Sequence, residues 1–182
     1  IKIKYLIMSL NQILTLSQTL RVTAKAQTMQ LPAQVMLVAP RAQLAYLDCQ
    51  SIRLPHPITP LQAWRQVMAR PLPGMKTAFR LRDAISARFG VARIGGFSGA
   101  VPDAPQVGDR LDFFLIEHLS DTVLTLTARD RHLDVMICIT TDADRLAITA
   151  SDITHNRFGR AYMLPVGPAH RLIVWAMLRR FA

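Results

Sequence analysis

A series of short segments that alternate apolar and polar residues constrains the fold of this chain most. Segments with this period of two, which is typical of half-buried strands, cover residues 109–118, 121–128, 132–141 and 145–155. The links between them hold only two or three residues, which is the length of a tight hairpin. Neighbouring segments are therefore predicted to pair antiparallel within one sheet.

Predicted helices and one further strand precede this series. A strand is predicted over residues 44–54, and the prolines at positions 55, 57 and 60 prevent it from continuing. Thr59 and Pro60 then form a typical helix start, with threonine as the N-cap and proline in the first turn. A second helix is predicted from Met75 to Phe89, with Gly90 as its stop. Residues 91–99 are predicted to form a strand that contains a glycine pair.

The C-terminal part is predicted to turn once more before a long helix. Residues 156–159 indicate a turn and residues 160–164 a short strand, and Gly167-Pro168 is predicted to open the final helix. An antiparallel sheet with one apolar face needs a cover, and this helix is the natural one. The sequence therefore predicts an α+β fold: about seven strands packed on a long C-terminal helix, with two short helices after the first strand.

The first thirty residues differ from the rest of the chain. They are too polar for a membrane-spanning helix and are expected to be a poorly ordered N-terminal extension. Residues 31–182 are predicted to form a single domain. A basic start and the small residues around Lys25 leave a signal peptide over residues 1–26 open as an alternative. Otherwise the expected location is the cytoplasm, since two cysteines make no disulfide framework.

The net charge of +10, from 22 Lys and Arg against 12 Asp and Glu, raises the question of a polyanionic partner. The basic excess falls in the predicted helices, while the predicted strands in the middle of the chain are acidic. No strand carries the combination of aromatic and basic residues that is typical of nucleic-acid readers. We therefore expect a solvated helical surface, no nucleic-acid partner and no stable membrane insertion.

Several longer motifs resemble a known family. WRQVMARPLPGMKTAFRLRDAISARFGV, VGDRLDFF, RDRHLDV and HNRFGRAYMLPVGPAHRLIVWAMLRR, in this order, are similar to a bacterial family catalogued as domain of unknown function 2867. The resemblance covers roughly residues 44–182, and no activity is established for the family. The order of elements also resembles the helix-grip fold of the START and Bet v 1-like (SRPBCC) superfamily. That resemblance implies a curved antiparallel sheet wrapped around the C-terminal helix.

Two polar clusters are candidate sites. His132 and Asp134 lie two apart on a predicted strand and are expected to share one face, where the carboxylate would orient the imidazole. The same alternation places Leu133 and Val135 on the opposite face. If that apolar face is inside, the pair lies outside and an acid/base role fails.

The second cluster lies nearer the C-terminus. Arg160 and Tyr162 are expected to share a strand face and to close a pocket, with an ion pair from Arg160 to Asp134 or Asp152 as the alternative. The remaining candidate ligand-binding residues are His155, Asn156 and His170. The histidines lack the local spacing of a zinc site, so neither a metal nor a cofactor is expected.

Three hypotheses follow for the function. The first is a binding module for a small hydrophobic or amphipathic ligand in a cavity between the sheet and the C-terminal helix, with Met136, Trp175 and Met177 among its walls. The second is an enzyme of the cyclase or hydrolase kind that uses His132 and Asp134 as acid and base. The third is a protein-docking domain. The sequence leaves the oligomeric state undetermined.

Overall fold

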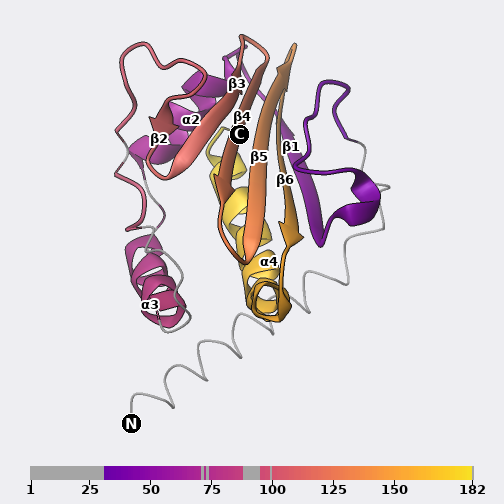
Figure 1. Cartoon of the computed structure of the whole chain (residues 1–182). Helices are drawn as coiled ribbons and strands as arrows, with labels where there is room; N and C mark the ends of the chain where they lie inside the picture. The colour runs from indigo at the N-terminus through magenta and orange to yellow at the C-terminus, as the bar shows by residue number, and fades with distance from the viewer. Residues whose placement is uncertain (1–30, 71, 73, 88–94, 99, 182) are drawn as a thin grey trace, which may run out of the picture. The chain divides into compact units, whose positions relative to one another are not determined.

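The computed structural model of the chain describes residues 31–70, 72, 74–87, 95–98 and 100–181. Six strands in these residues form one antiparallel sheet in the order β1-β6-β5-β4-β3-β2 (Figure 1). The strands are β1 (Tyr46–Arg53), β2 (Arg110–Leu111), β3 (Phe114–Leu119), β4 (Val123–Arg129), β5 (Leu133–Asp142) and β6 (Arg145–Thr154). The α+β class and the antiparallel pairing that the sequence predicted are confirmed.

The sheet has six strands in the described residues, where the sequence predicted about seven. The segment 109–118 divides into β2 and β3, because Asp112, at φ 56°, turns the chain between Leu111 and its partner Phe114. In the predicted strand 91–99, residues 95–98 form no strand, and the others lie outside the described residues. The predicted strand 160–164 is helical.

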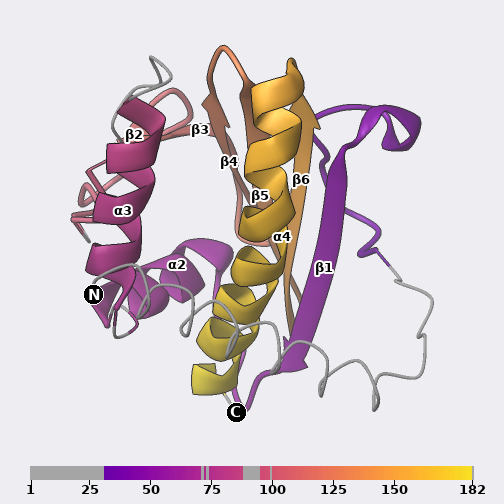
Figure 2. The same cartoon turned by 90° about the horizontal axis from the view of Figure 1, so that it is seen from below.

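Helix α4 (Arg157–Leu178) covers one face of the sheet, which we call the inner face (Figure 2). It begins at Asn156, whose side chain accepts a hydrogen bond from the Gly159 N–H, as an N-cap does. The predicted turn, short strand and later helix start were therefore wrong. The helix continues through Pro165 and Pro168, although each proline removes one N–H group from the backbone ladder.

Four further helical segments lie within the described residues. Helix α2 (Pro60–Ala69) starts as the sequence predicted, with a reciprocal capping box between Thr59 and Gln62. Helix α3 (Met75–Ala87) follows it, and the predicted end of this helix at Phe89 and Gly90 lies outside the described residues. Two short 3-10 helices, η1 (Arg41–Gln43) and η2 (Arg179–Phe181), precede β1 and end the described chain.

The outer face of the sheet is covered by the segment 31–40. The Met36 N–H donates a hydrogen bond to Cys138 Sγ at 3.3 Å, and the Val38 N–H donates to Ser151 Oγ at 3.0 Å. Side chains on both faces of the central strands are consequently buried, as Leu124 and Thr125 are on β4. In the part of the chain that the structure describes, no helix is both long and apolar enough to cross a membrane.

Candidate functional site

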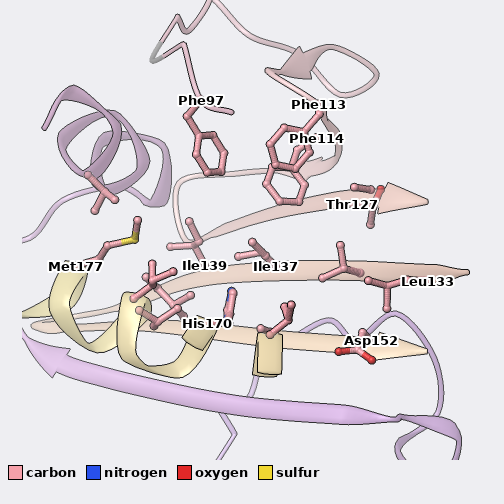
Figure 3. Close-up of a pocket in the computed structure, with 18 of the residues that line it drawn as sticks. Phe97, Phe113, Phe114, Thr127, Leu133, Ile137, Ile139, Asp152, His170 and Met177 are labelled. Atoms are coloured by element: carbon pink, nitrogen blue, oxygen red, sulfur yellow. The ribbon is translucent and has the colours of Figure 1, made fainter. Parts of the chain in front are cut away.

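A cavity of about 630 Å³ lies between the inner face of the sheet and the helices that cover it (Figure 3). Its volume is within the range of roughly 300–1,000 Å³ that is common for small-molecule sites. Most of the lining side chains are aliphatic or aromatic; the main ones are Trp64, Phe97, Phe113, Phe114, Val135, Ile137, Ile139, Ile148 and Met177. Such walls favour an apolar ligand body.

The register of the strands explains why this wall is apolar. Val135, Ile137 and Ile139 alternate onto the inner face of β5, as the sequence predicted, and Ala150 and Ile148 lie beside the last two on β6. Val174 and Met177 of α4 face them from the other side. Because side chains on a strand alternate with a period of two, each polar residue among these positions also faces the cavity.

Asp152 is such a polar residue, at the fourth inward position of β6 after Leu146, Ile148 and Ala150. Its side chain is 1% exposed, and its Oδ1 atom has no hydrogen-bond partner among the described residues. Burial raises the pKa of this carboxyl to about 6. In Figure 3, Asp152 and Met177 lie toward opposite ends of the cavity. The cavity therefore has one end that carries a buried acid and another that is apolar.

His132 is a second buried polar group in the cavity lining. It is 2% exposed, and its ring packs against Phe158 and Tyr162 at centroid distances of 5.3 and 5.8 Å. Neither ring nitrogen has a hydrogen-bond partner in the described part of the chain. An Asp130 oxygen lies 3.6 Å from Nδ1, which is too far for a hydrogen bond. Burial lowers the pKa of His132, so the neutral imidazole is favoured.

His170 and Tyr46 form a third polar contact at the cavity. The two rings meet edge to face at a centroid distance of 6.3 Å, and the Tyr46 hydroxyl donates to the Gly167 carbonyl at 3.2 Å. The Nδ1 atom of His170 has no hydrogen-bond partner among the residues described. Burial lowers the pKa of His170 and raises that of Tyr46, so both groups are held uncharged near neutral pH.

The structure brings three of the seven predicted site residues to the cavity: His132, Tyr162 and His170. Tyr162 arrives on a helix instead of the predicted strand, and its hydroxyl accepts a hydrogen bond from Arg82 Nε at 3.3 Å. Of the three residues predicted to form the cavity wall, Met136, Trp175 and Met177, only the last lines it. Met177 lines the cavity, while Trp175 is 43% exposed and lies beneath the Arg179 guanidinium at 4.7 Å. Met136 is buried but belongs to the opposite face of β5.

The expectation that His132 and Asp134 share a face was wrong. Strand β5 begins at Leu133, so His132 lies in the bend before it and the alternation of the strand does not extend to this residue. Asp134 instead accepts from Arg129 at 3.4 Å and lies 3.1 Å from His155 Nε2, and it is not part of the cavity lining. The predicted acid/base pair is therefore not assembled.

The other predicted residues lie outside the cavity lining. Asn156 caps α4 and also donates from Nδ2 to the Arg131 carbonyl at 3.3 Å. Arg160 is exposed, and the alternative ion pair with Asp134 or Asp152 does not form, because its helical position replaces the predicted strand. In the structure, Asn156 is therefore a helix cap and Arg160 is an exposed side chain, while Asp134 and His155 contact each other at 3.1 Å outside the cavity lining.

Sequence reasoning missed Asp152 and Arg82 as cavity residues. The signal for Asp152 was present, because it continues the inward alternation of β6. Arg82 carried no such signal, since its contact with Tyr162 joins two helices far apart in the sequence. No group of three or more histidine, cysteine or acidic side chains suited to a metal occurs within the described residues.

The fold and the cavity define an α+β protein in which a six-stranded antiparallel sheet and a C-terminal helix enclose an apolar site. The sequence profile of a family described as "Protein of unknown function (DUF2867)" matches residues 41–177, which is most of this sheet-and-helix unit. The chain belongs to this family. A comparison with curated proteins gives no match.

Proposed function

We propose that this protein is a binding module for a small hydrophobic or amphipathic ligand, held between the sheet and α4. The observation that carries the proposal is the 630 Å³ apolar cavity with two nearly fully buried polar side chains, Asp152 and His132, in its lining. A buried polar atom without a partner costs free energy, and a ligand that satisfies it recovers that cost. We propose no cofactor and no nucleic-acid partner. The expected location of the protein remains the cytoplasm.

The proposal extends to the fold. A sheet whose inner face lies along a long C-terminal helix supports the helix-grip architecture that the sequence resemblance implies. The contacts between Tyr46 and Gly167, and between Asp48 and Arg171 at 3.4 Å, tie β1 to this helix. We therefore propose membership of the START and Bet v 1-like superfamily and place the ligand in the space between the sheet and this helix.

The enzyme hypothesis has less support. Its pair of His132 and Asp134 is separated, because one side chain lines the cavity and the other forms ion pairs outside it. The docking hypothesis requires a contiguous apolar surface. Helix α4 does expose Leu164, Leu172 and Trp175, but Arg179 packs over the tryptophan ring. The cavity therefore favours binding of a small molecule over both alternatives.

Native mass spectrometry of the purified chain tests the proposal, followed by organic extraction and mass identification of the retained molecule. The matched variants are Ala150→Phe, which adds a ring to the cavity wall, and Ala161→Phe, which adds one at an exposed position of α4. We expect one defined ligand on the wild type and on Ala161→Phe, and none on Ala150→Phe. Equal retention by both variants would place the ligand elsewhere and contradict the proposal.

A further inference from the structure

The buried carboxyl of Asp152 restricts the chemistry of a ligand in this cavity. Its side chain is 1% exposed, lines the cavity, and leaves Oδ1 without a partner among the described residues. Tyr46, its neighbour on β1, donates its hydroxyl proton to the Gly167 carbonyl and so does not satisfy Asp152. A buried acceptor in this state is complemented by a hydrogen-bond donor.

The arginines that line the cavity are engaged elsewhere. Arg82 donates to Tyr162 and forms an ion pair with Asp83 at 2.9 Å. Arg129 pairs with Glu117 at 2.9 Å and with Asp134 at 3.4 Å. Arg110, the third arginine of the lining, donates to the Phe113 carbonyl at 3.3 Å. These three cations are thus held by other acids, a hydroxyl or a backbone carbonyl. Among the described residues, neither these arginines nor the lining histidines His132 and His170 donate to Asp152 Oδ1, so we look for its donor in the molecule that occupies the cavity.

We propose that the ligand is an amphipathic molecule whose polar head donates a hydrogen bond to Asp152, while its apolar body lies toward Met177. The inference rests on the proposed binding function and specifies the class of ligand. An alkyl amine and an alkyl alcohol share this chemistry, because both heads present a donor. A carboxylate head of the same length presents only acceptors to Asp152 and is repelled when that carboxyl is ionised.

The apolar body is accommodated by an aromatic wall. Phe113 and Phe114 lie at a centroid distance of 4.4 Å, and Phe97 meets Trp64 edge to face at 5.8 Å. All four line the cavity, and Trp64 is 4% exposed. A molecule that enters the cavity changes the surroundings of the Trp64 indole. Because the chain has two tryptophans, the variant Trp175→Phe makes Trp64 the only one and provides a fluorescence signal specific to the cavity.

The experiment is a fluorescence titration of the full Trp175→Phe chain at pH 7.5 with decylamine, decanol and decanoate, after extraction of any retained lipid. The three probes each contain ten carbon atoms and differ in the head; because one carbon of decanoate is its carboxylate carbon, its apolar chain is one carbon shorter, a difference of about 0.8 kcal/mol. We expect decylamine and decanol to bind at least about tenfold more tightly than decanoate, which corresponds to about 1.4 kcal/mol. Preference for the amine over the alcohol would identify a charged head, and the reverse a neutral one; both support the inference.

Two carboxyl variants connect the preference to Asp152. Asp152→Asn keeps the shape of the side chain but offers both a donor and an acceptor, so we expect the preference against decanoate to disappear. Asp48→Asn is the matched control, because Asp48 is also a buried acid of the sheet but pairs with Arg171 and Gln50 outside the cavity lining. It should retain the preference.

The failures of the two proposals are distinguishable. If decanoate binds as tightly as decylamine and Asp152→Asn changes none of the three affinities, the donor-head inference is overturned while the binding function stands. If no probe changes the fluorescence of Trp64, the binding function falls and the inference falls with it. Should Asp152→Asn fail to fold, the comparison of the three probes on the Trp175→Phe chain decides the outcome by itself.

Discussion

Gly159, in the first turn of α4, lies so close to the backbone carbonyl of His132 that a Cβ atom at position 159 would overlap the carbonyl oxygen. The His155 N–H donates to this same carbonyl at 3.0 Å, and Asn156 donates to the carbonyl of Arg131. The start of the helix is therefore fixed to the bend that turns the His132 ring into the cavity. The placement of α4 and the position of His132 in the cavity therefore depend on the same contacts.

Replacement of Gly159 by alanine is predicted to destabilise the fold. The added methyl group meets backbone, which cannot move aside as a flexible side chain does, and such overpacking typically costs about 1–3 kcal/mol. In a chain of this size each kcal/mol lowers Tm by roughly 2–4 °C. Thermal unfolding followed by circular dichroism measures the change.

Ala161→Gly is the control for the Gly159 variant, because it alters an exposed position in the same helix. It should lower the free energy of unfolding only by the difference in helix propensity between alanine and glycine, about 1 kcal/mol. A Gly159→Ala protein with an unchanged Tm would show that the helix start and the bend before β5 are not packed as described.

Asp152 is predicted to make the fold less stable as the pH rises. Burial raises its pKa from 3.8 to about 6, so the folded chain holds this proton more tightly than the unfolded chain does. The protonated carboxyl therefore contributes about 3 kcal/mol to the free energy of unfolding below pH 3.8, and this contribution is lost as the pH rises through 6. Urea unfolding of the wild type and of Asp152→Asn between pH 4 and 7 measures the difference.

The comparison with Asp152→Asn is needed because two histidines change the pH dependence of stability in the opposite direction. Burial lowers the pKa values of His132 and His170, so their contribution is lost as the pH falls below 6.5. Both histidines remain in the variant, and their effect cancels in the difference. Stability curves that stay parallel over the whole pH range would contradict a buried, unpartnered Asp152.

The strands that form the cavity wall were predictable because alternation is a local pattern. The pairings of Ile137 with Ala150 and of Ile139 with Ile148 follow from a period of two and from links of hairpin length. The helix start was not predictable in the same way. Gly167 and Pro168 are strong local signals for a helix boundary, and contacts along the sheet override them, including the hydrogen bond from Tyr46 to the Gly167 carbonyl.

The candidate site was predictable only in part, for a similar reason. His132 and Asp134 have the spacing of a pair, but a strand that begins one residue later separates them, and no local pattern fixes that boundary. Asp152 could have been found, since an acid in an otherwise apolar inward row is an informative exception. Its lack of a partner depends on the surrounding elements and requires the three-dimensional structure.

The separation of His132 from Asp134 predicts different effects of the two substitutions on binding. His132→Leu removes a polar side chain from the cavity and should weaken the binding of decanol about tenfold, measured by Trp64 fluorescence. This factor corresponds to the loss of one buried polar contact of about 1.4 kcal/mol. Asp134→Asn alters an ion pair outside the lining and should leave that affinity unchanged. An equal change of affinity in both variants would contradict the separation of these two residues.

The covered outer face of the sheet predicts that Cys138 is unreactive in the native protein. Its side chain is 0% exposed, Met36 donates to its sulfur, and burial raises the pKa of its thiol, which reduces the reactive thiolate. In the Cys49→Ser background, we expect no labelling by a disulfide reagent at pH 7.5 until urea unfolds the chain. Cys49 is only half-buried, so its labelling in the Cys138→Ser background should be faster.

The same labelling also tests what covers the outer face. The Met36 thioether accepts a hydrogen bond from Thr125 at 3.3 Å beside the Cys138 thiol, so Met36→Ala should open a path to the sulfur and accelerate native-state labelling. Val107→Ala, at an exposed residue of the 100–109 segment, is the control and should leave the rate unchanged. If Cys138 is labelled as fast in the native Cys49→Ser protein as in urea, the segment 31–40 does not cover this face in solution.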